Sequence, residues 1–125
     1  MSVTLSSDQA LRLLHGLSHS LVGDAKFEAA PDFTLRQFAI LLTIYRVQPP
    51  HTVRGLAKNL GVTKPVITRA LDALGKYGLC ARRRDANDGR NVIIQRTVQG
   101  ALYVESLGDL VVAKAAGLKD AEVEE

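Results

Sequence analysis

The sequence predicts a mainly α-helical fold with one small β-hairpin. Three observations support this prediction. Apolar residues recur at helical spacing through most of the 125-residue chain. Two of these periodic segments are short and are joined by a tight turn, which is typical of a helix-turn-helix. Directly after them the period changes to short runs around turn-forming residues, which is typical of two paired strands.

The first helix is expected over residues 8–22. Ser6, with Gln9 three positions further on, has the pattern of a capping box at the start of a helix. Gly23 follows the last apolar residue, and a loop is expected from there to Pro31. The leucines of this helix lie on one stripe: Leu11, Leu14, Leu17 and Leu21.

The clearest helix is expected after Thr34, which is its predicted N-cap, with Gln37 completing a second capping box. Apolar residues surround nearly the whole circumference of the segment that follows. Such a pattern indicates a helix in the middle of a core. Pro49 and Pro50 end this segment, because the residue before a proline is disfavoured in a helix.

Two short helices are expected next, over residues 53–60 and 64–77. Ala57 is small enough for a close helix crossing, Gly61 can adopt the left-handed conformation of the turn, and Ile67 lies in the core beneath the crossing. This spacing predicts a helix-turn-helix, although tight helical corners in other proteins can show it too. The buried stripe of the second helix is predicted to comprise Ile67, Ala70, Leu71 and Leu74.

The start of the second short helix presents polar residues outward. Thr63 is its predicted cap, and Pro65 falls in the first turn, where a missing N–H does no harm. Side chains of these types can bond to base edges and phosphates in a major groove. The alternative is an ordinary polar helix face. The predicted recognition residues are Thr63, Lys64, Pro65, Thr68 and Arg69.

A basic hairpin follows, with "LCARRR" and "NVIIQR" as strands and "DANDGR" as the turn. Arg90 stands at the tip, where it is predicted to enter a minor groove, and Asp88 is close enough to orient it. Charge on exposed strands can also serve only to discourage edge aggregation. Beside a helix-turn-helix, however, the hairpin predicts a winged helix-turn-helix. The remaining wing residues predicted to follow phosphates are Arg82, Arg83 and Arg84.

The charge distribution agrees with a polyanionic partner. Residues 51–100 carry ten basic and three acidic groups, a balance of +7, whereas residues 1–50 balance to zero and residues 101–125 to −4. A concentration of positive charge in one section is the electrostatic footprint expected for nucleic acid. A merely well-solvated face remains the alternative.

A final helix is expected over residues 98–116, capped by Thr97 and followed by "KDAEVEE" as a solvated acidic tail. The chain thus divides into an N-terminal helical region (1–32), a winged helix-turn-helix domain (33–97) and a C-terminal helix with its tail (98–125). The final helix carries an apolar side formed by Val104, Leu107 and Val111.

Residues 33–115 resemble the MarR family of bacterial winged-helix transcription regulators. The most specific match is in the wing, where Asp85, Asp88 and Arg90 follow the family's acidic–acidic–Arg pattern, whereas Arg96 stands where an apolar residue is common. The resemblance implies a homodimer that binds pseudo-palindromic double-stranded DNA, usually as a repressor. It also implies dimerisation through helices from both chain ends, and release by a small aromatic ligand in many members.

The predicted dimer surface lies outside the basic section, because that section is committed to DNA. One helix-turn-helix reads only a few base pairs, which discriminates weakly against the competing sites of a genome. A two-fold dimer would double the contacts and raise this discrimination. The candidates are the stripe Leu11, Leu14, Leu17 and Leu21, and the side formed by Val104, Leu107 and Val111. The alternative is that these stripes only close the domain's own core.

Other functions have weaker support. His15 and His19 share a helix face, but with only His51 elsewhere in the chain they do not complete a metal site. Cys80 is the single cysteine, and is expected to be a buried apolar filler with a redox switch as the alternative. No catalytic motif, cofactor motif, signal peptide or membrane-spanning run is present, so a cytoplasmic, non-enzymatic protein is expected. The competing function is a winged-helix module that binds an acidic protein partner.

Overall fold

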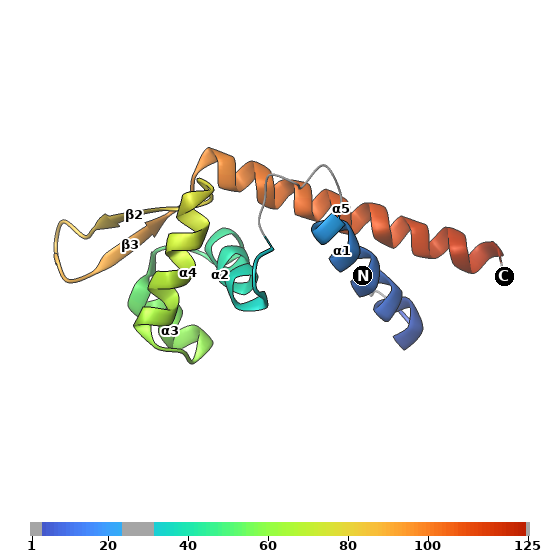
Figure 1. Ribbon diagram of the computed structural model, residues 1–125, viewed down its shortest axis with the longest axis horizontal. Helices are drawn as coiled ribbons and strands as arrows, with labels where there is room; N and C mark the ends of the chain where they lie inside the picture. Colours follow the sequence, from blue (N-terminus) through green and yellow to red (C-terminus); the bar gives the residue numbers. More distant parts are fainter. Residues whose placement is uncertain (1–3, 24–31, 125) are drawn as a thin grey trace. The chain divides into compact units, whose positions relative to one another are not determined.

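The computed structural model describes residues 4–23 and 32–124 (Figure 1). Five helices and a small sheet follow one another within these residues, which confirms a mainly α fold with a hairpin wing. The chain divides into two compact units, residues 33–104 and a unit formed by residues 1–32 with 105–125. The elements are α1 (Ser7–Gly23), α2 (Leu35–Arg46), β1 (His51–Thr52), α3 (Val53–Leu60), α4 (Lys64–Lys76), β2 (Ala81–Arg84), β3 (Val92–Gln95) and α5 (Val98–Glu124).

Helix α2 forms the centre of the 33–104 unit. Its predicted capping box is confirmed, since the Thr34 hydroxyl accepts from the Gln37 amide at 3.1 Å and the Gln37 side chain accepts from the Thr34 amide at 2.9 Å. Burial around the helix is less complete than predicted: Leu35 is 86% exposed, because the first turn extends beyond the core. The fully buried side chains of α2 are Ile40, Leu41 and Ile44.

Helix α4 packs against both α2 and α3, and α3 and α4 form the predicted helix-turn-helix. Gly61 takes the left-handed conformation (φ 68°) that the turn requires, which a side chain at this position would disfavour. Thr52 caps α3 by accepting from the Gly55 amide at 2.9 Å. The predicted buried stripe of α4 is confirmed in full: Ile67, Ala70, Leu71 and Leu74 are all buried.

Thr63 occupies the N-cap position of α4, as predicted, but its side chain makes no capping hydrogen bond. Pro65, the second residue of the helix, has no N–H, so Val66 at the third position is the one donor that an N-cap side chain could use, and that bond is not made. The hydroxyl of Thr63 therefore lies exposed at the start of the helix without serving that cap.

The sheet is antiparallel with the strand order β1–β3–β2, and the β2–β3 hairpin projects from the helices (Figure 1). Strand β1 was absent from the sequence prediction, because two residues are too few to show an alternating pattern. It pairs His51 with Ile94 and Thr52 with Ile93, so it joins the segment before α3 to the base of the wing.

Helix α5 continues to Glu124, so the predicted end near residue 116 was wrong. The sequence "KDAEVEE" was interpreted from its charge, but Ala, Lys and Glu are also strong helix formers. Nothing in that composition opposes continuation of the helix. Gly117 does not end it, since an isolated glycine costs a helix only about 1 kcal/mol.

In the unit formed by the chain ends, α1 begins with the predicted Ser6–Gln9 capping box, with bonds of 2.9 and 3.1 Å. Helices α1 and α5 lie close at Gly16, where an added Cβ would contact the Lys114 side chain at 3.4 Å. Leu107 and Leu118 are buried in this unit. Among the described residues, no helix has the length and apolar character needed to cross a membrane.

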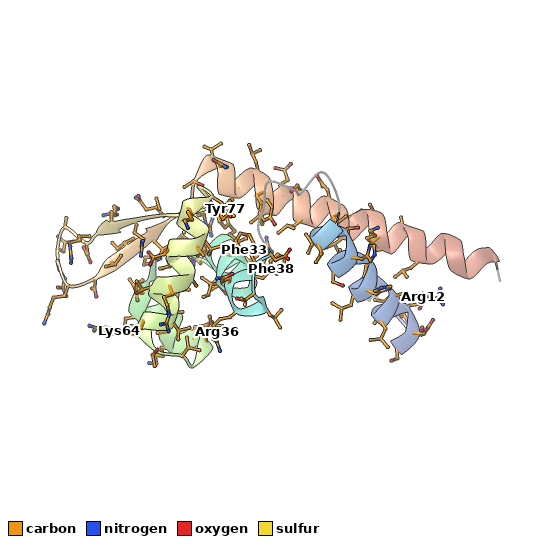
Figure 2. All side chains as sticks on the ribbon, in the orientation of Figure 1. Arg12, Phe33, Arg36, Phe38, Lys64 and Tyr77 are labelled. Atoms are coloured by element: carbon orange, nitrogen blue, oxygen red, sulfur yellow. The ribbon has the colours of Figure 1, made fainter. Side chains whose placement is uncertain are left out.

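The first two turns of α5 belong to the 33–104 unit and pack closely against its other residues. Phe33 makes edge-to-face contacts with Tyr77 at 6.2 Å and with Tyr103 at 6.4 Å, and Figure 2 shows Phe33 beside Tyr77. A Cβ built on Gly100 would overlap the hydroxyl of Tyr45 and the carbonyl oxygen of Leu79. No side chain fits at this position, so the close approach of α5 depends on Gly100.

We expect Gly100→Ala to lower the free energy of unfolding by about 1–3 kcal/mol, the usual cost of forcing extra volume into a packed site. Thermal and urea unfolding would measure it. Gly108→Ala is the matched control on the same helix, because nothing lies within 4 Å of its added Cβ. The control should stabilise the protein by about 0.5–1 kcal/mol, since glycine is the weaker helix former. Equal effects of the two substitutions would contradict the close contact.

Candidate nucleic-acid interface

Helix α4 divides into a buried face and an exposed face. The buried face serves the core, whereas every residue predicted to read DNA is exposed: Thr63, Lys64, Pro65, Thr68 and Arg69. Figure 2 shows Lys64 at the opposite end of α4 from Tyr77. The exposed side chains are those that the fold does not use, and they comprise two cations and two hydroxyls at the start of one helix.

The three consecutive arginines of β2 do not form one row, because alternate residues of a strand point to opposite faces. Arg82 faces α4, where its Nη2 donates to Asp72 Oδ1 at 2.5 Å. Arg84 is held within the wing by a 2.7 Å bond from its Nη1 to the Gly89 carbonyl. Arg83 lies on the outer face of the sheet, beside its register partner Ile93. Arg83 therefore points to the opposite face from Arg82 and Arg84. The prediction that all three arginines follow phosphates stays a prediction.

The wing tip has a defined geometry. Asp88 Oδ1 accepts from the backbone N–H of Arg90 at 3.1 Å and from its Nε at 3.2 Å. These two bonds hold the pKa of Asp88 below its ordinary value, the backbone bond having the larger effect, and the charge of Arg54 lowers it further. Asp88 thus stays ionised and orients Arg90, whose side chain is 88% exposed.

Arg54 is a candidate residue that the sequence reasoning missed. It lies exposed in the first turn of α3, and its charge acts on Asp88 of the wing. The sequence contained a signal for this residue. A cation in the first turn of a helix is unfavourable because it opposes the helix dipole, so its presence there indicates a role other than stability. Arg36 in α2 and Lys64 in α4 occupy similar positions, and in the part of the chain that the structure describes these three first turns carry no acidic residue.

The residues predicted to form a dimer surface differ in exposure. Leu11 and Leu14 are 62% and 63% exposed, whereas Leu17 and Leu21 are half-buried. Val104 packs against the core of the 33–104 unit, and Leu107 is buried, so these two residues serve the single chain. Val111 is 39% exposed, and its neighbour Val112 is more exposed still.

The remaining candidates are placed as follows. Cys80 is buried at the base of the wing, and burial raises the pKa of its thiol, while the charge of Arg82 acts in the opposite direction. His15 and His19 lie edge to face on α1, 5.9 Å apart. Residues 4–23 and 32–124 contain no group of three His, Cys, Asp or Glu side chains that could hold a metal ion.

These elements define a winged helix: a helix-turn-helix whose second helix has an exposed basic start, followed by a basic two-stranded wing. Comparison with known proteins shows what the chain is similar to. Residues 33–92 match the model of the MarR family.

Individual proteins are similar to the chain over a longer stretch. The HTH-type transcriptional repressor YetL of Bacillus subtilis (strain 168) is 29% identical over 103 residues, which is 78% of this chain and 55% of the repressor. The chain thus spans little more than half the length of that relative. CouR of Rhodococcus jostii RHA1, solved bound to a 23-mer DNA duplex, is 26% identical with a TM-score of 0.66 over 88% of this chain and 72% of CouR. A MepR mutant of S. aureus shares the fold at a TM-score of 0.71 and 23% identity, over 94% of this chain and 85% of MepR.

We expect the Cys80 thiol to react with iodoacetamide at pH 8 at least about tenfold more slowly in the native protein than in urea. Cys80 is only 6% exposed, and the raised pKa of its thiol leaves less of the reactive thiolate at this pH. Because Cys80 is the only cysteine, the denatured protein is its own reference. Equal rates in both states would show an accessible thiol and would favour a redox switch.

Proposed function

We propose that this protein is a sequence-specific regulator of transcription that binds double-stranded DNA as a homodimer and acts as a repressor. One observation carries the proposal. The exposed face of α4 presents Lys64, Thr68 and Arg69, while its opposite face is completely buried, and the same unit carries a wing whose Arg90 is held in place by Asp88. The exposed polar side chains of α4 and the basic tip of the wing are not needed for folding, and both suit contacts with DNA.

The start of α4 is proposed to enter the major groove. That groove is about 12 Å wide, which admits a helix, and each base pair presents a distinct pattern of donors and acceptors there. Arg69 and Lys64 suit the acceptors of guanine, and the hydroxyl of Thr68 suits a donor or an acceptor. The exposed hydroxyl of Thr63 adds a further polar group at the end of the helix that would enter the groove first.

The wing is proposed to lie along the neighbouring minor groove. The negative potential of a narrow minor groove attracts arginine, and this contact reads groove shape more than base identity. The bond from Arg90 Nε to Asp88 restricts the arginine side chain before DNA arrives. Such preorganisation reduces the entropy lost on binding.

Phosphate contacts are proposed for Arg54, Arg83 and Arg84. Arg54 stands in the first turn of α3, where helix dipole and side-chain charge both favour an anion. Contacts of this kind position the protein without carrying sequence information. They should each contribute to a steep fall of affinity with salt concentration.

The homodimer is proposed to form through the unit made by the chain ends. Leu11 and Leu14 expose large apolar side chains on α1, and Val111 and Val112 do so on α5. Burying a leucine contributes about 1.5–3 kcal/mol, so covering this surface with a second copy is favourable. A small aromatic effector is a further prediction from the family, in which CouR, one of the structural neighbours, binds p-coumaroyl-CoA.

A protein partner is the second candidate, and one observation favours it. The outer face of the sheet carries an open groove of about 530 Å³, lined by Pro49, Pro50 and Ile93 with Arg83 and Arg96 beside them. An acidic, partly apolar segment would suit that groove. The DNA measurements below separate the two functions, because a protein-binding module would show no preference for any DNA sequence.

We expect Arg90→Ala to weaken binding to a selected DNA site by about 1–3 kcal/mol, with a similar loss across sequences. Binding-site selection with the native protein supplies the site, and titration at several salt concentrations measures the loss. Lys76→Ala is the control, since it removes one exposed positive charge at the far end of α4. Equal losses for both variants would assign the effect to net charge and remove the minor-groove role of Arg90.

We expect the double substitution Leu11→Ser and Leu14→Ser to shift the native mass from dimer towards monomer at micromolar concentration, as measured by light scattering. If both leucines lie in the interface, their replacement removes about 3–6 kcal/mol of the free energy gained by burying them in the dimer. Leu35→Ser is the matched control, because Leu35 is 86% exposed on α2 in the other unit. A native protein that is already monomeric, with or without selected DNA, would overturn the homodimer.

A further inference from the structure

The turn between α4 and β2 receives an unusual set of hydrogen bonds. Three consecutive carbonyl groups, those of Tyr77, Gly78 and Leu79, each accept from a side chain of another segment. Gln99 Nε2 donates to Tyr77 O at 2.9 Å, Thr97 Oγ1 donates to Gly78 O at 2.6 Å, and Tyr45 Oη donates to Leu79 O at 2.6 Å. We call these three acceptors and their three donors the carbonyl clamp.

The donors of the carbonyl clamp are themselves held together. The Thr97 amide donates to Tyr45 Oη at 3.0 Å, and the Gly100 amide donates to Thr97 Oγ1 at 2.9 Å. Arg96 adds two bonds to the end of α2, from Nε to Ile44 O at 2.8 Å and from Nη2 to Val47 O at 3.0 Å. The end of α2, the turn after α4 and the start of α5 therefore meet in one network within the 33–104 unit.

Termination of α4 does not require this network. The helix already ends in a complete Schellman motif, with Leu79 N donating to Leu74 O at 3.1 Å and Gly78 N donating to Gly75 O at 3.0 Å. Carbonyl groups at and beyond such a helix end commonly accept hydrogen bonds from water. The carbonyl clamp instead uses side chains that lie about 20 residues later or more than 30 residues earlier in the chain.

The turn holds two DNA-facing elements at once. Helix α4 ends at Lys76 and β2 begins at Ala81, so only four residues, 77–80, connect the recognition helix to the wing. Lys64 lies about 18 Å from this turn along α4. A tilt of α4 by about 10° at the turn would displace Lys64 by about 3 Å, which is close to the ~3.4 Å rise of one base pair.

We propose that the carbonyl clamp is a positioning element that sets the distance between the two recognition helices of a dimer, and with it the half-site spacing that the protein accepts. This inference rests on the proposed function. Half-sites must lie about 34 Å apart along the DNA for two recognition helices to enter successive turns of the major groove. Tyr45, Thr97 and Gln99 touch no DNA in this account, and they act through the orientation of α4.

The test is a binding selection on DNA libraries in which two copies of the native half-site are separated by spacers of different length. Tyr45→Phe removes one clamp bond and the amide contact of Thr97. Gln99→Met removes another clamp bond from an exposed side chain, so its folding is not at risk. Gln95→Met is the matched control on β3, outside the carbonyl clamp. Circular dichroism and thermal unfolding check each fold.

We expect both clamp variants to keep the native half-site sequence but to accept spacers one base pair longer or shorter. Their preference for the optimal spacer should fall about two- to tenfold, the range for the net loss of one hydrogen bond. Gln95→Met should keep the native preference. A merely structural role would lower the unfolding temperature without changing the spacer that is preferred.

Each alternative outcome is decisive. Native spacer preference in folded Tyr45→Phe and Gln99→Met would overturn the carbonyl clamp as a positioning element. If Tyr45→Phe does not fold, the spacer preference of Gln99→Met alone decides whether the carbonyl clamp is a positioning element. A changed half-site sequence with unchanged spacing would assign these residues to base reading instead. Failure of the native protein to select any DNA would overturn the proposed function, and the inference with it.

Discussion

The hydroxyl of Tyr45 is the contact on which the arrangement of the 33–104 unit depends. It donates to the Leu79 carbonyl and accepts from the Thr97 amide, and so it joins the end of α2 to both the turn after α4 and the connection into α5. This group is in place only because Gly100 has no side chain. A fully buried hydroxyl left without such partners would cost about 1–3 kcal/mol, and the half-buried hydroxyl of Tyr45 would cost less. The bonds therefore fix a single arrangement of three segments that are distant in the sequence.

The division of α4 follows from the same arrangement. Ile67, Leu71 and Leu74 are completely buried, which fixes the rotation of α4 about its axis. Once that rotation is fixed, the opposite face of α4 points into solvent. This face carries Lys64, Thr68 and Arg69. Core packing thus decides which face of α4 can meet DNA, whereas the turn at residues 77–80 decides its tilt. Rotation and tilt are separate requirements, and different side chains meet them.

Local signals in the sequence were sufficient for most of the fold. The capping boxes at Ser6 and Thr34, the left-handed Gly61 and the four buried residues of α4 all follow from short-range rules, and the structure has each of them. The errors involve information that is not local. Strand β1 exists only through its pairing with β3, and the unequal roles of Arg82 and Arg83 appear only once the register of the sheet is known. The contacts of Tyr45 span 34 and 52 residues, so no window of sequence could have indicated them.

The three acidic residues of the basic section are better explained by geometry than by charge balance. Residues 51–100 contain only Asp72, Asp85 and Asp88 against ten basic groups. Asp72 accepts from Arg82, Asp88 accepts from Arg90, and Asp85 accepts from the Asn87 amide at 2.9 Å in the turn of the wing. Exposed ion pairs contribute little to stability, about 0–1 kcal/mol each, so their energetic value to the fold is small. Their effect is to restrict two arginines and one turn while a net charge of +7 remains. Such a surface still attracts a polyanion through its net positive charge. The restricted arginines reduce the number of side-chain conformations in which the surface can bind it.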